Sequence, residues 1–276
     1  MTIKHRILII FIKFFKLFPI LFGRKFYWEF MSAFIENLKC VYVATVGCDY
    51  CKFRIISNLT YFRAKTLLTK EPETIRWMDS FPKDSVMLDI GANIGTYTVY
   101  AARICRAKVI AIEPSPPNYA TLICNIAENS IEDRVYPICA AAGLDTKFSQ
   151  LHRHYGGIVA GGSGVIFDSN RINDNEIINQ IDKIYSMGIS IDHLLDFPGI
   201  PFPNYLKLDV IGTQDDVLNG ALKLLSDERL VGAMIEMPEP DDSKFQICMS
   251  IVKDSGLMEC ENFKSDNPTE FFFVRS

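Results

Sequence analysis

The sequence predicts an α/β fold, with a mostly parallel sheet covered by helices on both faces and an antiparallel hairpin at its C-terminal end. From Val86 onward, short apolar runs alternate with amphipathic helical segments, an alternation typical of doubly wound parallel sheets. A glycine loop follows the first of these runs, where a strand passes into a helix. The last two apolar runs, "LMECENF" and "EFFFVRS", favour a closing hairpin.

Each element follows from a local pattern of apolar residues and helix signals. Ser115 is suited to cap a helix and Pro116 to begin its first turn. The polar, glycine-rich segment 151–164 has no clear periodicity and is expected to be a loop. The expected strands are 86–90, 108–114, 134–142, 204–210 and 230–237. The expected helices are 95–106, 115–129, one whose apolar face runs from 217 to 225, and 245–255.

Composition bounds the class of protein. The chain has 276 residues, 49% of them hydrophobic, and a net charge of −4. This favours one large globular domain with an appendage and gives no reason to expect a nucleic-acid partner. We expect an N-terminal basic-hydrophobic helix with an appended segment over residues 1–60, and a catalytic domain over 61–276. The composition indicates no oligomeric state.

The first 25 residues are rich in apolar and aromatic side chains. Lys13, Lys16 and Pro19 interrupt the apolar run, so it falls far short of the roughly 20 residues that a membrane span needs. A helix lying on a membrane surface and a helix packed against protein both fit this pattern. The sequence therefore predicts a cytoplasmic protein in which contact with a membrane surface remains open.

Cysteine usage agrees with a reducing compartment. Cys105, Cys124 and Cys139 lie within apolar helices and strands, where reduced thiols serve as small hydrophobic side chains. Cys48 and Cys51 have the spacing of half a zinc site, but no second pair at that spacing follows. We therefore expect neither a zinc site nor a redox motif at this pair.

The loop "DIGANIG" (89–95) narrows the choice of cofactor. Aligned on Gly91, the second and third glycines of the dinucleotide fingerprint would fall on Asn93 and Thr96. Those glycines let the backbone approach a pyrophosphate and let the helix pack closely. Since both are missing, a nicotinamide or flavin dinucleotide is disfavoured.

Two acids at consecutive strand ends favour S-adenosylmethionine instead. Asp89 could accept from the methionine ammonium, directly or through water. Glu113, at the end of the next strand, could accept from both ribose hydroxyls. The alternative is that Asp89 caps the helix and Glu113 is a surface acid, but two acids at adjacent strand ends favour a ligand site.

Several motifs in order resemble one family. "TLLTKEPETIRWMDSF", "MLDIGANIGTYTVYAAR", "VIAIEPSPPNYATLICNI", "SIDHLLDF" and "YLKLDVIGTQDDVLNGA" closely resemble FkbM-type S-adenosylmethionine-dependent methyltransferases, from about Tyr61 to the C-terminus. The resemblance implies a class I methyltransferase Rossmann-like fold. It also implies methyl transfer to a hydroxyl of a sugar, glycan or related small molecule. The residues then expected to bind the cofactor are Glu71, Asp89, Gly91, Ala92, Asn93, Gly95, Thr96, Glu113, Pro114 and Asp209.

One departure from the family pattern bears on the acceptor. The family usually has a D-V-E-G-x-E motif after its fourth strand, and here both glutamates are replaced, by Ile211 and Gln214. If those acids organise the acceptor pocket, this chain has a changed substrate or a weakened activity. Lys207, Asp209 and Gly212 remain in place.

Three residues are candidates for removing a proton from the acceptor hydroxyl. Asp209 is the first because it ends a strand that faces the expected cleft, although it could instead stabilise the turn near Gly212. His152 and His154 are the second because histidine titrates near working pH. No third ligand accompanies the two histidines, so we expect no metal.

Two other functions stay open at this stage. A cofactor-binding scaffold without turnover would explain Ile211 and Gln214. A nicotinamide-dependent oxidoreductase would share the fold, but the missing glycines argue against it.

Overall fold

The computed structural model describes residues 13–14, 17, 20–154, 160–162, 165–167 and 180–275. Its contacts divide the chain into two compact units, Met1–Cys40 and Val41–Ser276. The division falls between residues 40 and 41, whereas the sequence placed it between 60 and 61. The difference arises because β1 (Val41–Val46) and β2 (Asp49–Arg54) form an antiparallel hairpin that packs on the rest of the larger unit through buried residues of β2.

The N-terminal unit contains the helix α2 (Arg24–Asn37), none of whose side chains is buried. Phe26, Trp28 and Phe34 are exposed on it. Most of the predicted basic-hydrophobic segment 1–25 lies outside the described residues. Among the residues that are described, no helix is long and apolar enough to cross a membrane.

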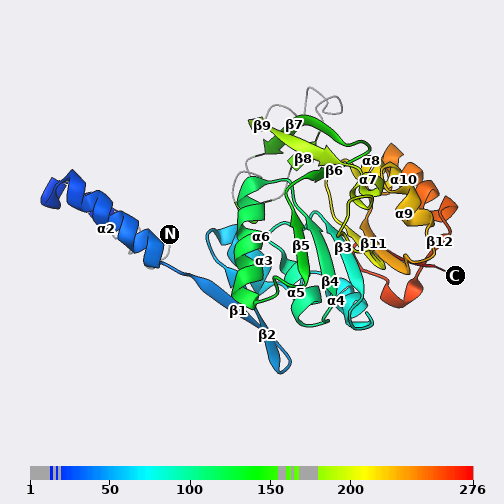
Figure 1. Cartoon of the computed structure of the whole chain (residues 1–276), viewed down its shortest axis with the longest axis horizontal. Helices are drawn as coiled ribbons and strands as arrows, with labels where there is room; N and C mark the ends of the chain where they lie inside the picture. Colours follow the sequence, from blue (N-terminus) through cyan, green and yellow to red (C-terminus); the bar gives the residue numbers. More distant parts are fainter. Residues whose placement is uncertain are drawn as a thin grey trace. The chain divides into compact units, whose positions relative to one another are not determined.

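The larger unit is built on a seven-stranded sheet, which confirms the predicted α/β fold. The strand order is β12-β13-β11-β10-β3-β4-β5. β11, β10, β3, β4 and β5 are parallel, whereas β13 is antiparallel to both β11 and β12, as a terminal hairpin requires (Figure 1). The strands are β3 (Val86–Ile90), β4 (Lys108–Ile112), β5 (Val135–Ile138), β10 (Tyr205–Leu208), β11 (Gly232–Glu236), β12 (Leu257–Glu259) and β13 (Glu270–Arg275).

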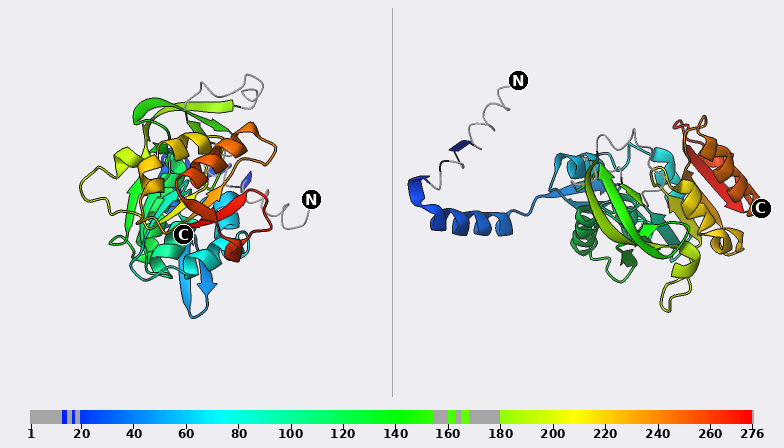
Figure 2. Two further views of the ribbon diagram at one scale, coloured as in Figure 1. Left: turned by 90° about the vertical axis from the view of Figure 1, so that its right-hand side faces the viewer. Right: turned by 90° about the horizontal axis from the view of Figure 1, so that it is seen from above.

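Two buried clusters cover the opposite faces of this sheet. One joins it to α7 (Ile191–Leu194), α8 (Gln214–Asn219), α9 (Leu222–Ser226) and α10 (Ser243–Asp254). The other joins it to α3 (Asn58–Lys65), α4 (Pro72–Asp79), α5 (Thr96–Arg103), α6 (Pro116–Asn129) and the β1–β2 hairpin. Figure 2 shows α10 beside the terminal strands in both views.

Alternation along the strands decides which side chains meet. Leu206 and Leu208 of β10 join the first cluster, so Lys207 points to the opposite face. In the parallel register Lys207 lies beside Asp89 of β3. The same face of the sheet therefore gathers charged groups at its centre, behind the site.

The structure corrects two sequence predictions beside the main sheet. The segment 151–164, expected to be a loop, begins inside a strand of a second sheet of order β6-β9-β7-β8. The expected strand 134–142 is divided between β5 of the main sheet and β6 of the second. Pairing with β9 makes β7 a strand even though its sequence is polar, and hydrophobic periodicity does not detect such pairing. The second sheet consists of β6 (Ala141–Ala142), β7 (Lys147–His154), β8 (Val165–Phe167) and β9 (Gln180–Ile189).

The helix expected through 217–225 is interrupted at Gly220. A Cβ at this position would lie 2.1 Å from the carbonyl oxygen of Gly143. The close approach of two backbones requires glycine here and separates α8 from α9.

Candidate functional site

A pocket of about 200 Å³ opens at the carboxyl ends of β3, β4, β10 and β11. This is where open α/β sheets bind ligands. Its lining residues are Arg63, Lys70, Gly91, Asn93, Glu113, Pro114, Asn118, Gly162, Asp209, Val210, Ile211 and Glu236.

The glycine loop between β3 and α5 is fixed by close contacts. Gly91 has a φ of 82°, and a Cβ there would lie 1.9 Å from the carbonyl oxygen of Asp209. Gly95 has a φ of 80°, and its Cβ would lie 2.4 Å from Leu122 Cδ1. The first glycine therefore lets the ends of β3 and β10 meet, and the second lets α5 pack against α6.

Glu113 forms one end of the pocket and is held by neutral donors. Its Oε2 accepts from the backbone N–H of Asn93 at 2.8 Å. Its Oε1 accepts from the N–H of Ser115 at 2.9 Å and from Asn118 Nδ2 at 3.2 Å. Asn118 and Asn93 also donate to the carbonyl oxygen of Gly162, at 3.0 and 2.9 Å, and so fix the loop that closes this end.

These bonds set both the charge and the free capacity of Glu113. Burial raises the pKa of Glu113 to about 7, although the three donors oppose the rise. A carboxylate offers about four acceptor positions. Three are filled by protein donors, which leaves room at Oε2 for a ligand hydroxyl.

Asp209 lies at the other end of the pocket and is held by a cation. Lys207 Nζ donates to Asp209 Oδ2 at 3.1 Å, and the lysine side chain is 1% exposed. Burial alone would raise the pKa of Asp209, but the Lys207 ammonium holds it well below its usual range. Burial alone would lower the pKa of Lys207, and the carboxylates of Asp209, Asp89 and Glu71 raise it instead.

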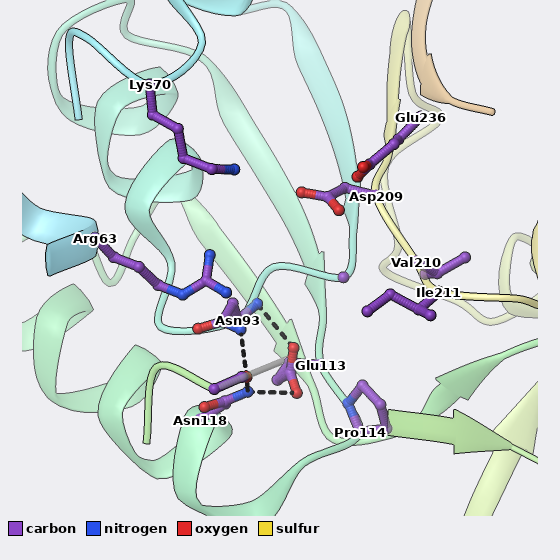
Figure 3. Close-up of a pocket in the computed structure, with 12 residues that line it drawn as sticks. Arg63, Lys70, Asn93, Glu113, Pro114, Asn118, Asp209, Val210, Ile211 and Glu236 are labelled. Carbon is purple, nitrogen blue, oxygen red and sulfur yellow. Dashed lines mark hydrogen bonds between the residues drawn. The ribbon is translucent and has the colours of Figure 1, made fainter. Parts of the chain in front are cut away.

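Glu236 stands beside Asp209 (Figure 3). It is the last residue of β11, which lies next to β10 in parallel register. Burial, followed by the hydrogen bond with Asp209, raises the pKa of Glu236 to about 9. The pocket thus holds a carboxyl pair in which Asp209 carries the negative charge.

Two buried carboxylate oxygens lie behind the pocket lining. Asp89 accepts from Thr98 Oγ1 through Oδ2 at 2.5 Å, and Glu71 pairs with Lys70 through Oε1. Within the described residues, Asp89 Oδ1 and Glu71 Oε2 have no hydrogen-bond partner. Since buried acceptors are usually satisfied, these two oxygens are open to a donor from a ligand or water.

The sequence-predicted residues divide between the pocket and its support. Gly91, Asn93, Glu113, Pro114 and Asp209 line the pocket. The other five are buried or nearly buried around it and are absent from its described lining: Glu71, Asp89, Ala92, Gly95 and Thr96.

The two histidines are placed differently from the expected closing loop. His152 is 4% exposed and lies in β7, and His154 is the last residue of that strand. Neither belongs to the described lining of the pocket. Their role as a general base therefore gains no geometric support here.

The two departures from the family pattern are also separated. Ile211 is 47% exposed and lines the pocket. Gln214 is 6% exposed, begins α8 and is not among the described lining residues. The Ile211 substitution therefore changes the pocket surface, whereas that of Gln214 changes the support of α8.

Sequence reasoning missed four polar or charged lining residues: Arg63, Lys70, Asn118 and Glu236. Glu236 could have been found, because it ends the strand that follows Asp209 in the sheet. Asn118 could also have been found, in the first turn of the helix after Glu113. Arg63 lies on α3, outside the strand-and-loop pattern, and its Nε donates to the carbonyl oxygen of Gly161.

Comparison with known proteins identifies the family of this chain. The family model for the methyltransferase FkbM domain matches residues 89–263. "Methyltransferase 1" of Beauveria bassiana is 26% identical over 152 residues, covering 51% of this chain and 59% of that protein. "Hexuronic acid methyltransferase AglP" of Haloferax volcanii is 26% identical over 191 residues, covering 68% of this chain and 72% of that protein.

A solved structure of low identity is also similar to this chain. The FkbM methyltransferase of Methylobacillus flagellatus is 16% identical, with a TM-score of 0.46, and covers 80% of this chain and 56% of that one. The chain thus spans less than two thirds of the first relatives that it matches. The family model covers more than half of the chain and includes the glycine loop, both carboxylate ends of the pocket and the strands between them. The chain therefore belongs to the FkbM methyltransferase domain family.

Proposed function

We propose that this chain is an S-adenosylmethionine-dependent O-methyltransferase that acts on a hydroxyl of a sugar, a glycan or a related metabolite. The observation that carries the proposal is the two-ended pocket at the strand termini. A carboxylate held by neutral donors forms one end of it, and a lysine-held carboxyl pair forms the other. Membership of the FkbM family supports the same reaction class.

The residues present fit S-adenosylmethionine. The cofactor's ammonium would be held by the open oxygens of Asp89 and Glu71, directly or through water. A ribose hydroxyl would donate to Glu113, where one acceptor position remains. Gly91 and Asn93, both at positive φ, would hold the loop against the ligand.

The chain's own work is positioning, water exclusion and proton handling. When bound, S-adenosylmethionine supplies a methyl group already activated on a sulfonium centre. The protein then has to align a hydroxyl with that methyl and receive its proton. Asp209 is the candidate for this task, because its side chain keeps 27% exposure while lining the pocket.

The acceptor class rests on the relatives and on the charge of the pocket lining. One relative carries the name hexuronic acid methyltransferase, and a sugar ring offers the hydroxyl that the reaction needs. Arg63 and Lys70, which line the pocket, supply positive charge that would suit an acidic sugar.

The test is methyl transfer from labelled S-adenosylmethionine to a panel of uronic acids, neutral sugars and nucleosides. We expect labelled product from a sugar, and Asp209→Asn to lower kcat by about 100-fold or more. Asp196→Asn, at an exposed acid of the same fold, serves as the matched control. Binding of NAD(H) without S-adenosylmethionine, or cofactor binding without transfer to any acceptor, would replace this proposal with the oxidoreductase or the scaffold function.

We also propose that the protein is cytoplasmic and contacts a membrane surface through its N-terminal unit. Residues 1–40 carry seven Lys and Arg against two Glu, together with eight of the twenty Phe. Phe26 and Trp28 of α2 are exposed. Basic and aromatic side chains together favour anionic lipid surfaces.

Vesicle flotation checks this second proposal. The full chain should float with vesicles rich in phosphatidylglycerol and remain behind with neutral phosphatidylcholine. Phe26→Ser with Trp28→Ser should reduce the floated fraction. Equal flotation with both lipids, or none with either, would remove the proposal.

A further inference from the structure

Two carboxyl groups stand side by side at the end of the pocket away from Glu113 (Figure 3). Asp209 directly follows β10 and Glu236 ends β11. The register pairs Leu208 with Ile235, so the next residue on each strand is one of the acids. Side chains on neighbouring parallel strands at the same level share a face of the sheet.

A carboxyl pair this close holds one proton, because two adjacent carboxylates cannot both ionise without a large repulsion. The position of the proton follows from Lys207. Its ammonium lies 3.1 Å from Asp209 Oδ2 and stabilises the charge on that residue. The proton therefore resides on Glu236, whose pKa is raised to about 9 by burial and by Asp209.

The charged groups around Glu236 favour its protonated form. From β10 it faces Asp209 and Lys207, and from the turn before α4 it faces Glu71. On the antiparallel neighbour β13, Glu270 lies opposite it in the register. Ser265 and Asn267 donate to Glu270 and hold that acid in its own network. Lys70 also lines the pocket, and its charge lowers the pKa of Asp209 and of Glu270. Apart from these two lysines, the charged neighbours are acids, and they resist a second negative charge on Glu236.

We propose that Glu236 works in its protonated form, donating to Asp209 and so orienting that carboxylate toward the acceptor hydroxyl. This rests on the proposed methyl transfer. As the carbon–oxygen bond forms and the carbon–sulfur bond of the donor breaks, the hydroxyl proton passes to a free lone pair of Asp209 and then to solvent. Asp209 is the catalytic residue and Glu236 positions it.

A protonated Glu236 predicts different kcat values for two substitutions of similar size. Glu236→Gln keeps a donor toward Asp209 and carries no charge, so kcat should fall by no more than about threefold. Glu236→Leu removes the donor and should lower kcat by about 10- to 100-fold, the value of a hydrogen bond to a charged group. A structural role alone would not restore activity through the amide.

The pH profile gives a second sign. As pH rises through about 9, Glu236 loses its proton and its hydrogen bond to Asp209, so wild-type kcat should fall. Glu236→Gln should lack this falling limb. A Glu236→Gln variant as slow as Glu236→Leu, or a wild-type rate that climbs through the same range, would overturn the proposal in favour of an ionised Glu236 acting as base.

A spectroscopic readout is independent of turnover. The infrared difference between wild type and Glu236→Gln near neutral pH should contain the C=O band of a protonated carboxylic acid, and the band should vanish above pH 9. The difference removes the contribution of Glu113, whose pKa is about 7. If the band is observed but no methyl transfer occurs, the carboxyl pair is supported and the proposed function is overturned. If methyl transfer occurs but the band is absent, only the proposal of a protonated Glu236 is overturned.

Discussion

The two ends of the pocket each hold a carboxyl group, but the pKa values of these two groups are shifted in opposite directions. Each places a carboxyl group at the end of a parallel strand, with Glu113 4% exposed and the Asp209 side chain 27% exposed. Glu113 is surrounded by neutral donors, and its pKa is raised to about 7. Asp209 adjoins the buried ammonium of Lys207, and its pKa is lowered. Burial alone therefore does not set the state of such an acid; the charge of its neighbour decides.

This difference suits two tasks. A carboxyl group held by hydrogen bonds from neutral donors keeps an acceptor position for a ligand hydroxyl. A carboxylate that stays ionised beside a fixed lysine remains available to accept a hydrogen bond from the acceptor hydroxyl. Removing the side chain that distinguishes each end tests this difference.

The largest effect is expected for Lys207→Met. Removing the ammonium leaves the charges of Asp209 and Asp89 buried without compensation, which should cost about 3–5 kcal/mol of unfolding free energy. Urea unfolding at pH 7 measures this, with Lys253→Met at an exposed position of α10 as the control. A loss below about 1 kcal/mol would show that Lys207 does not hold the acidic end together.

The next effect concerns the neutral end. Because the pKa of Glu113 is raised from 4.5 to about 7 on folding, the folded state binds more protons than the unfolded state between these values. The contribution of Glu113 to the unfolding free energy is fully present below pH 4.5. It falls as pH rises through 7, by up to about 3 kcal/mol.

Glu113→Gln should remove that slope. The unfolding free energies of wild type and variant should be measured at pH 5 and pH 8. The variant should be more stable relative to wild type at pH 8 than at pH 5. The remaining acids cancel in the difference. An equal difference at both pH values would mean that Glu113 is ionised as readily when folded as when unfolded.

The smallest effect concerns the contact that joins the two ends. Gly91→Ala would place a Cβ 1.9 Å from the backbone oxygen of Asp209, whereas Gly212, at a φ of 73°, has nothing within 4 Å. Both substitutions incur the cost of a left-handed conformation, about 1 kcal/mol. Gly91→Ala should cost about 2 kcal/mol more in thermal or urea unfolding. Equal costs would show that the loop can move away from β10.

Much of the fold could be predicted because its central elements carry strong local patterns. The strand at 86–90 and the helix at 116–129 appear as expected, since apolar runs, Ser115 and Pro116 define them. The strand β7 was missed because its pairing with β9, rather than its own polar sequence, makes it a strand. Periodicity reports burial, and β7 exposes residues such as Phe148.

The site was predicted in part for a related reason. Glu113 and Asp209 end strands, so one rule places both at the pocket. Glu236 obeys that rule and was overlooked. Arg63 and the Gly162 backbone reach the pocket from α3 and from a loop, through contacts between parts of the chain about 100 residues apart. A single sequence contains no local signal for such contacts.

Calorimetric titration with S-adenosylhomocysteine tests the central claim, that Glu113 at the neutral end holds the cofactor's ribose and Asp209 at the lysine-held end serves the acceptor. Wild type should bind at micromolar Kd. Glu113→Ala should weaken binding at least about 10-fold by removing a hydrogen bond to a charged group, whereas Ile211→Ala at the acceptor end should change Kd by less than about threefold. No binding by folded wild type, or a greater loss in Ile211→Ala than in Glu113→Ala, would contradict the assignment of the two ends.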